Sequence, residues 1–166
     1  MTDPLVDGTD AVALVAELTR RGQTLASAES LTAGLFAATV AGVPGASAVL
    51  RGGVIVYATD LKDSLAGVAE STLAADGPVA PTTAAELAAG AIARCGADWG
   101  VGLTGVAGPD PQDGKPVGTV FVGIAGPDGV RVRELTLPGG RWEIRRAVVD
   151  AALSDLLGRV RSVASG

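Results

Sequence analysis

The sequence predicts a three-layer α/β/α fold with a mixed β-sheet, and three observations support this expectation. Strand-like and helix-like segments alternate along the N-terminal part of the chain, as in parallel sheets whose strands are joined by helices. Nearer the C-terminus, two strand-like runs flank Pro127-Asp128-Gly129 and predict an antiparallel hairpin. Hydrophobic residues make up 48% of the 166 residues, which is enough for one core, so we expect a single domain over residues 1–166.

The N-terminal part predicts a helix, a strand and a second helix. The first helix carries its apolar residues on one face and ends at Gly22, a residue suited to a helix C-cap. The second helix begins beside Ser30, which places this serine at a strand–turn–helix junction. The three elements span Thr9–Arg21, Gln23–Ala28 and Leu31–Val40.

The central part begins with an unusual strand, Ala48–Tyr57. Gly52 and Gly53 interrupt its β-branched residues and permit a bulge or a close backbone approach. Two short helices are expected next. Thr83-Ala-Ala-Glu86 then has the capping-box pattern, in which a hydroxyl and a carboxylate satisfy each other's backbone N–H groups, so a helix is predicted to start there and to run to Cys95.

The C-terminal part predicts the remaining strands and a long helix. A strand over Trp99–Thr104 leads into a glycine-rich loop, Gly105–Lys115. The hairpin strands are expected over residues 118–125 and 130–137. The amphipathic pattern over Arg141–Val163 predicts a helix that packs across the sheet.

Charge and composition narrow the class of ligand. The net charge of -5 argues against a nucleic-acid partner, because binding phosphates along a backbone needs clustered Lys and Arg. No segment reaches the roughly 20 apolar residues of a membrane span, and the acidic N-terminus is unlike a signal peptide. We therefore expect a cytoplasmic protein that binds a small molecule, without nucleic-acid or membrane partners.

The sequence contains no histidine. This removes the Ser-His-Asp and Cys-His catalytic arrangements and the commonest ligand of zinc, copper and iron, so we expect neither a metal nor a cofactor. A catalytic serine would need a Lys or a Tyr as its base. The single cysteine, Cys95, is interpreted as a small core residue near a helix end.

Three loops follow predicted strands, which is where open α/β sheets bind ligands. In the first, Ser30 is either a plain helix N-cap or an exposed hydroxyl beside helix N–H groups that attract an anion. In the second, Lys62 is either a solvated charge or the base that takes a proton from Ser30, once its surroundings depress its pKa. In the third, the glycines that follow Thr104 either form an ordinary turn or bring backbone N–H groups to a phosphate or an oxyanion.

Two arginines are candidate phosphate ligands. Arg141 and Arg145 lie four residues apart, so they share one helix face and can bind a phosphate together. Surface salt bridges are the alternative role for both side chains.

Taken together, these segments resemble the C-terminal domain of the competence/damage-inducible CinA family. The resemblance extends from about Leu14 to Leu157 and rests on several motifs in the same order. The motifs are Ala28-Glu29-Ser30-x-Thr32-x-Gly34, Val43-Pro44-Gly45-Ala46-Ser47, Gly52-Gly53-Val54 through Tyr57 and Lys62, Gly67-Val68, Thr104-Gly105-Val106-Ala107-Gly108-Pro109, and Lys115-Pro116-Val117-Gly118-Thr119-Val120.

The resemblance implies a nicotinamide-nucleotide amidohydrolase that converts nicotinamide mononucleotide and water to nicotinate mononucleotide and ammonia, and it implies a homodimer. It also implies that Ser30 is the nucleophile and that Tyr57 and Lys62 assist it. Neutral Lys62, directly or through Tyr57, would take the proton from Ser30 while backbone N–H groups hold the oxyanion. The substrate-binding residues are then expected to be Glu29, Thr32, Gly34, Thr104, Gly105, Arg141 and Arg145.

Two residues depart from the family's usual Ala-Glu-Ser-Cys-Thr-Gly-Gly. Leu31 stands at the cysteine position and removes no group assigned to the chemistry. Ala33 adds a methyl group where the backbone is expected to approach the substrate, which bears on affinity and substrate choice. Full-length members also carry an N-terminal molybdopterin-binding-like domain, and its metal-dependent pyrophosphatase chemistry is not expected of these residues.

Two other functions fit the same residues. The first is a non-catalytic nucleotide-binding or regulatory module, which would bind the nucleotide in the pocket and not hydrolyse it. An amidase for another small amide would keep the chemistry and act on a different substrate. Ammonia release from nicotinamide mononucleotide tests the first alternative, and a panel of amides tests the second.

Overall fold

The computed structural model describes residues 3–163 and contains a mixed five-stranded sheet with the strand order β2-β1-β3-β4-β5. Strand β1 pairs in parallel with β2 and β3, whereas β4 is antiparallel to β3 and β5. The expected mixed sheet and its C-terminal hairpin are therefore confirmed. The strands are β1 (Leu25–Glu29), β2 (Leu50–Ile55), β3 (Trp99–Gly105), β4 (Thr119–Gly126) and β5 (Gly129–Thr136).

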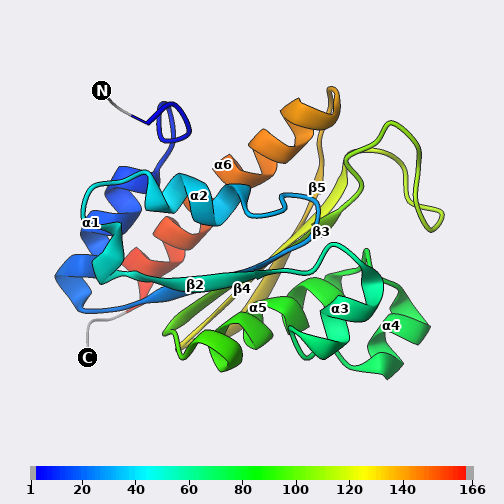
Figure 1. Ribbon diagram of the computed structural model, residues 1–166, viewed down its shortest axis with the longest axis horizontal. Helices are drawn as coiled ribbons and strands as arrows, with labels where there is room; N and C mark the ends of the chain where they lie inside the picture. Colours follow the sequence, from blue (N-terminus) through cyan, green and yellow to red (C-terminus); the bar gives the residue numbers. More distant parts are fainter. Residues whose placement is uncertain (1–2, 164–166) are drawn as a thin grey trace.

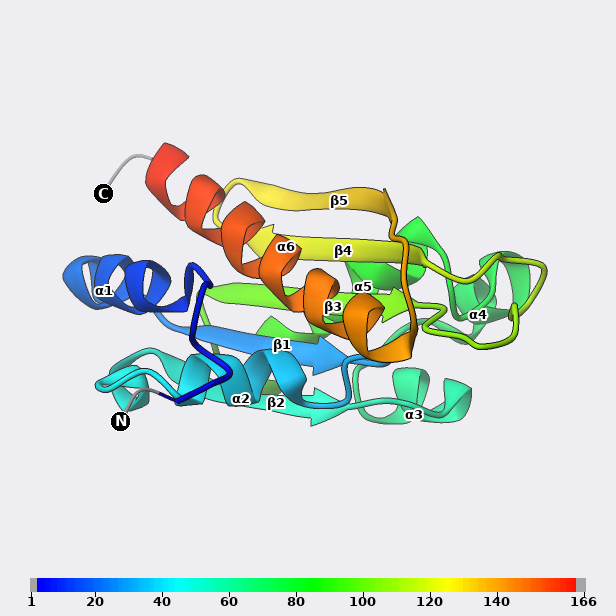
Figure 2. The same cartoon turned by 90° about the horizontal axis from the view of Figure 1, so that it is seen from above.

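Helices cover both faces of the sheet, which gives the three layers that the sequence predicts (Figure 1, Figure 2). Helices α1, α2 and α6 lie on one face, and α3, α4 and α5 lie on the other. Their bounds are α1 (Ala11–Arg21), α2 (Leu35–Ala41), α3 (Thr59–Ser64), α4 (Glu70–Asp76), α5 (Pro81–Cys95) and α6 (Arg141–Ser162), with a 3-10 turn over Ala46–Ala48.

Hydrophobic clusters lie on both faces of the sheet. The largest one packs α1, α2 and α6 against the strands, and a smaller one packs α5 against the opposite face, with Cys95 half-buried at its border. Helix α5 lies so close to the sheet that a Cβ at Gly102 or Gly123 would come 2.4 or 2.2 Å from the carbonyl oxygen of Ala84. Glycine is needed there because any side chain would push the helix away.

Helix α5 begins earlier than the sequence predicts, and its capping box is absent. The helix starts at Pro81, whose fixed φ and missing N–H suit the first helical position. Thr83 Oγ1 donates to the carbonyl oxygen of Gly77 at 2.7 Å, and the Glu86 carboxylate accepts from the N–H of Ala69 at 2.8 Å. Both side chains therefore tie α5 to the preceding segments and do not cap it.

The unusual centre of β2 is confirmed. The register between β1 and β2 shifts after Leu25, which pairs with Leu50, so that Ala26 pairs with Gly52. A Cβ at Gly53 would lie 2.5 Å from the Ser27 hydroxyl, which shows how closely the two backbones approach. Because β1, β2 and β3 are parallel, their carboxyl ends share one edge of the sheet, and the three candidate loops meet there.

Candidate active site

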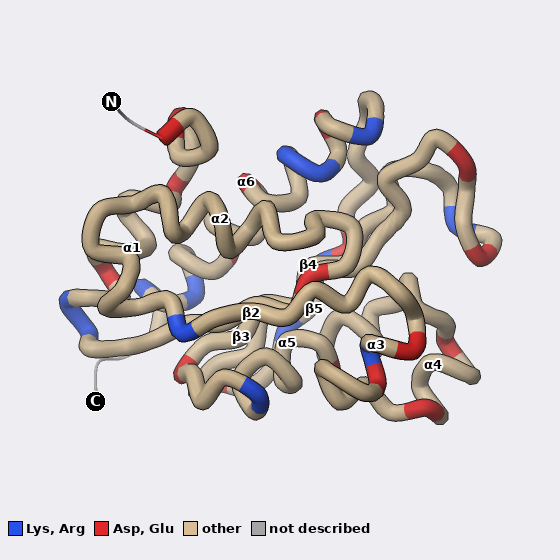
Figure 3. The backbone as a smooth tube through the Cα atoms, in the orientation of Figure 1, with Lys and Arg blue, Asp and Glu red and all other residues tan. Residues whose placement is uncertain are grey.

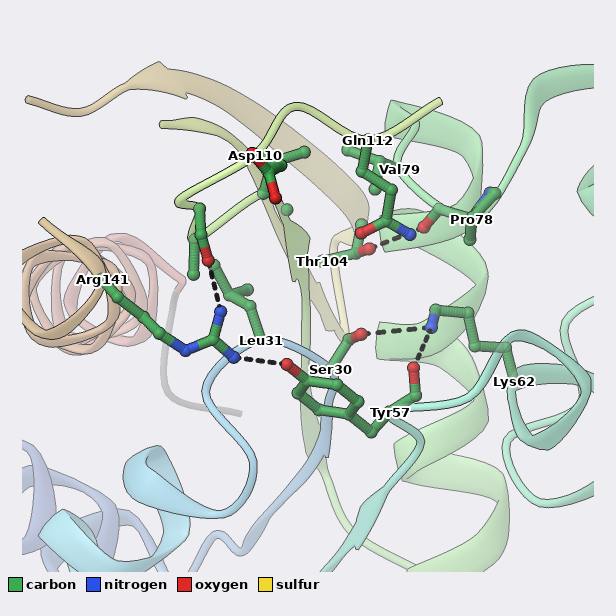
Figure 4. A pocket seen from close by; sticks show the side chains of 14 residues that line it. Ser30, Leu31, Tyr57, Lys62, Pro78, Val79, Thr104, Asp110, Gln112 and Arg141 are labelled. Carbon is green, nitrogen blue, oxygen red and sulfur yellow. Dashed lines mark hydrogen bonds between the residues drawn. The ribbon is translucent and has the colours of Figure 1, made fainter. Parts of the chain in front are cut away.

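A pocket of about 130 Å³ lies where the loops after β1, β2 and β3 meet, beside the first turn of α6 (Figure 4). The structure brings six of the predicted site residues together around it, and four others lie outside. The six that line the pocket are Ser30, Tyr57, Lys62, Thr104, Gly105 and Arg141.

Ser30 follows β1 directly and is fixed by its backbone. Its N–H donates to the carbonyl oxygen of Leu103 at 2.9 Å. The prediction that a helix begins beside this serine is wrong, because α2 begins only at Leu35. Ala33 (φ 49°) and Gly34 (φ 93°) have left-handed conformations that an α-helix cannot contain, so a turn separates Ser30 from the helix. Ser30 is thus no helix N-cap.

Lys62 lies in α3 and is the buried basic group of the pocket, with 2% of its surface exposed. Its Nζ lies 3.1 Å from Ser30 Oγ, 2.9 Å from the carbonyl oxygen of Val56 and 3.5 Å from that of Tyr57. Within residues 3–163, no carboxylate lies within 4.0 Å of this nitrogen. Burial without a counter-ion lowers the pKa of Lys62 to about 8.

Tyr57 enters the site in two ways. Its carbonyl oxygen faces Lys62, whereas its half-exposed phenol points to α6 and accepts a hydrogen bond from Arg141 Nη2 at 2.5 Å (Figure 4). Arg141 Nη1 also donates to the carbonyl oxygen of Gly108 at 2.6 Å. Because Lys62 reaches Ser30 directly and the phenol is bonded to Arg141, the structure shows no proton relay through Tyr57 in the part of the chain that it describes.

The end of β3 and the loops after β1 and β3 supply polar atoms to the pocket. The Thr104 hydroxyl donates a hydrogen bond to the carbonyl oxygen of Pro78 at 2.6 Å, so its hydrogen is not available to a ligand. The backbone N–H groups of Leu31 and Ala107, two buried residues that line the pocket, have no acceptor among the described residues. An N–H group that has no protein acceptor and belongs to a pocket-lining residue can donate to a ligand, so both are candidate donors to a negatively charged oxygen.

Glu29 does not reach the pocket, contrary to the expectation that it binds substrate. Its side chain is buried with 1% of the surface exposed, and its carboxylate accepts four hydrogen bonds. The donors are the N–H groups of Gly34 (3.0 Å), Phe36 (3.1 Å) and Ala37 (2.9 Å), and the hydroxyl of Ser27 (3.0 Å). A carboxylate is favourable there because the first turn of a helix carries unpaired N–H groups and positive potential. Glu29 therefore caps α2.

Three more predicted binding residues lie outside the pocket. The Thr32 side chain is buried and Gly34 precedes α2. Arg145 donates from Nε to the carbonyl oxygen of Leu31 (2.8 Å) and from Nη2 to that of Thr32 (3.0 Å), so it holds the turn after Ser30. Arg141 and Arg145 share a helix and have different targets, which corrects the expectation of a joint phosphate site.

The methyl group of Ala33 is also away from the pocket. Ala33 is exposed and does not line the cavity, so its expected approach to the substrate stays a prediction. The residue adopts a strained left-handed backbone with φ of 49°.

Eight further residues line the pocket that were not among the predicted site residues, and four of them are Pro78, Val79, Asp110 and Gln112. Pro78 and Val79 come from the connection before α5, and Asp110 and Gln112 come from the glycine-rich loop. The last two lie in a loop that the sequence marks as a candidate site, so their position offered a signal. Nothing in the sequence around Pro78 indicates that this connection folds against β3.

Residues 3–163 hold no group of three or more Cys, Asp or Glu side chains placed to bind a metal ion. None of the helices in the same range combines the length and apolar character required to cross a bilayer.

Comparison with known protein families gives one match over most of the chain. The model of the CinA C-terminal domain matches residues 9–160. A CinA-like protein from Frankia casuarinae is 53% identical over 143 residues, covering 86% of this chain and 33% of the relative. A CinA-like protein from Anaeromyxobacter is 46% identical over 144 residues, covering 85% and 35%. The chain thus spans about a third of the length of these curated relatives.

Solved structures give the same result for the fold. The competence/damage-inducible protein from Agrobacterium tumefaciens superimposes with a TM-score of 0.90 at 33% identity, covering 98% of this chain and 99% of that one. The competence damage-inducible protein A from Klebsiella pneumoniae superimposes with a TM-score of 0.87 at 28% identity, covering 93% and 99%. The two structures therefore share this arrangement of sheet and helices over almost their whole length.

Proposed function

This chain belongs to the CinA C-terminal domain family, and from that premise we propose that it is a serine amidohydrolase that converts nicotinamide mononucleotide and water to nicotinate mononucleotide and ammonia. The observation that carries the proposal is the 3.1 Å contact between Lys62 Nζ and Ser30 Oγ, two residues that line the same pocket. This distance allows direct proton transfer between the two side chains.

The surroundings of Lys62 prepare it to act as the base. In its neutral form the amine has two N–H groups and one lone pair. The two N–H groups donate hydrogen bonds to the carbonyl oxygens of Val56 and Tyr57. The lone pair is then free to accept a hydrogen bond from the Ser30 hydroxyl. With a pKa of about 8, roughly a quarter of the amine is neutral at pH 7.5. The two carbonyl groups therefore orient the base, as the third member of a catalytic triad does.

The reaction then proceeds through an acyl-enzyme. Ser30 Oγ attacks the carboxamide carbon as its proton passes to Lys62, and the negatively charged oxygen is stabilised by backbone N–H groups, with Leu31 and Ala107 as candidates. Protonated Lys62 gives this proton to the leaving nitrogen, the C–N bond breaks and ammonia departs. Water, deprotonated by Lys62, attacks the ester carbon and releases the carboxylic acid and Ser30. The proton count returns to its starting value.

Arg141 is the group proposed to bind the phosphate of the nucleotide. Its guanidinium lines the pocket and is held by two neutral oxygens, those of the Tyr57 phenol and the Gly108 carbonyl. Within residues 3–163, no carboxylate lies within 4.0 Å of it. A guanidinium without a counter-ion at the edge of a pocket suits a phosphate, which it can bind through two N–H groups.

The test is ammonia and nicotinate mononucleotide formation by the purified protein, compared with Ser30→Ala and with Ser71→Ala, which removes an exposed hydroxyl on α4. We expect turnover by the wild type and Ser71→Ala, and background ammonia release with Ser30→Ala. Binding without turnover by the wild type would favour the non-catalytic module. Equal turnover of free nicotinamide would favour an amidase that makes no use of the phosphate.

A further inference from the structure

Asp110 is an acidic side chain of the pocket that has no basic partner. Figure 4 shows its carboxylate on the side of the glycine-rich loop, across the pocket from Ser30 and Lys62. In the described part of the chain, no Lys or Arg nitrogen lies within 4.0 Å of this carboxylate. Asp110 is therefore available to a ligand.

The pocket is lined by side chains of both signs of charge. Figure 3 shows where basic and acidic residues lie along the backbone. Lys62 and Arg141 are its basic side chains and Asp110 is its acidic one. Arg141 is held by the neutral oxygens of Tyr57 and Gly108, so it does not neutralise Asp110. Opposite charges that line one pocket without pairing favour a ligand that carries both signs at separate places.

We propose that Asp110 selects substrates whose aromatic ring carries a positive charge, a pyridinium, over neutral rings of the same shape. The inference rests on the proposed function and names the residue that sets its substrate class. In nicotinamide mononucleotide, the ring nitrogen is bonded to ribose and carries a formal positive charge, while the phosphate is negative. With the phosphate on Arg141 and the carboxamide at Ser30, the ring would lie in the pocket that Asp110 also lines.

Tyr57 supplies a second feature suited to such a ring. It is the aromatic side chain among the residues that line the pocket, and half of it is exposed. The flat face of an aromatic ring is attractive to a cation and to a planar ligand. The pyridinium charge also disfavours a proton on Lys62, which helps the lysine to act as a base.

The experiment compares two nucleotides that differ chiefly in ring charge: oxidised nicotinamide mononucleotide and its 1,4-dihydro form, whose ring is neutral. Dissociation constants are measured by calorimetry on Ser30→Ala protein, so that turnover does not interfere. Asp110→Asn is then added to this background, and Asp113→Asn serves as the matched control. Asp113 is an exposed acidic residue of the same loop that does not line the pocket.

We expect Asp110→Asn to weaken binding of the oxidised nucleotide about tenfold and to leave the dihydro form within about twofold. Asp113→Asn should change neither. An equal loss for both nucleotides, or no loss for the oxidised one, would overturn the proposal. The same selectivity should appear with the 1-methylnicotinamide cation against nicotinamide, because the two differ by the ring charge and one small methyl group.

If the protein does not deamidate the nucleotide, the binding experiment can still test the role of Asp110. If the wild type releases no ammonia while the oxidised nucleotide still binds in an Asp110-dependent manner, Asp110 selects a cationic ring in a non-catalytic pocket. Absence of binding by either nucleotide to the folded protein would overturn both proposals.

Discussion

Lys62 Nζ and Ser30 Oγ lie 3.1 Å apart, although 32 positions separate the two residues along the chain. The parallel pairing of β1 with β2 creates this contact, because the loop after each strand emerges at the same edge of the sheet. The lysine is buried in α3 with carbonyl oxygens as its other partners. Its charge is therefore costly, and both the pH dependence and the stability of the protein depend on it.

The rate should rise with pH as Lys62 loses its proton. The pKa of Lys62 is lowered to about 8, and only the neutral amine accepts the Ser30 proton. We expect kcat/KM to increase about tenfold per pH unit below this value and to level off above it. Measurements between pH 6.5 and 9.5 keep the substrate phosphate mostly ionised, since its second pKa is about 6. A flat profile over this range would contradict the role of Lys62 as base.

Replacing the lysine should separate stability from activity. Lys62→Met keeps the apolar stem and removes the buried charge, so we expect loss of turnover with a gain of at most about 3 kcal/mol in the free energy of unfolding at pH 7, because the variant also loses the hydrogen bonds of the amine. The sign follows from the pKa of Lys62, which is about 8 in the folded protein against 10.5 for an unperturbed lysine. Between these values the unfolded chain binds more protons, so wild-type stability rises with pH.

Urea unfolding at pH 7 and pH 9.5 checks this prediction. The wild type should gain stability relative to Lys62→Met between the two pH values, because the variant lacks the group that titrates. A difference between the two proteins that does not change with pH would show that the lysine charge is not costly in the fold.

Arg141 should act on the phosphate of the substrate. We expect Arg141→Ala to raise KM for nicotinamide mononucleotide at least about tenfold, because a charge-assisted contact is lost. KM for nicotinamide riboside, which lacks the phosphate, should change little. Arg161→Ala, at the exposed far end of α6, is the control. An equal rise in KM for both substrates would show that Arg141 acts by holding the loops of Tyr57 and Gly108 in place and not by binding phosphate.

Glu29 should matter for stability through the start of α2. Glu29→Gln keeps the shape and replaces one accepting oxygen with an NH₂ group that faces backbone donors. We expect the free energy of unfolding to fall by about 3 kcal/mol, because buried donors lose a charged acceptor. Glu70→Gln, an exposed residue of α4, should have almost no effect. Equal stability of the two variants by urea unfolding would contradict the capping role.

Ala33 is expected to affect stability and not substrate choice. A left-handed alanine costs about 1–2 kcal/mol, and glycine loses about 0.5–1 kcal/mol more on folding. Ala33→Gly should therefore raise the free energy of unfolding by about 0.5–1 kcal/mol and leave kcat/KM unchanged. Ala38→Gly, an exposed position inside α2, should lower stability by a similar amount. A change in KM with Ala33→Gly would support the view that this residue approaches the substrate.

The sequence by itself determined the order of strands and helices along the chain, the C-terminal hairpin and three of the loops that line the pocket. Periodic apolar residues and turn residues report local structure, which is why these elements are readable from the chain. The absence of histidine narrowed the base to Lys or Tyr, and family motifs pointed to Ser30 and Lys62.

Only the tertiary structure decided which partner each polar side chain takes. Glu29 and Arg145 look like binding residues in the sequence, yet packing turns one to the start of α2 and the other to the turn after Ser30. The Tyr57 phenol accepts a hydrogen bond from Arg141, 84 positions away. Asp110 lines the pocket because the glycine-rich loop folds back towards it. Such contacts depend on how distant segments pack, because a hydrogen bond is fixed by distance and direction in space, and neither is encoded in local propensity.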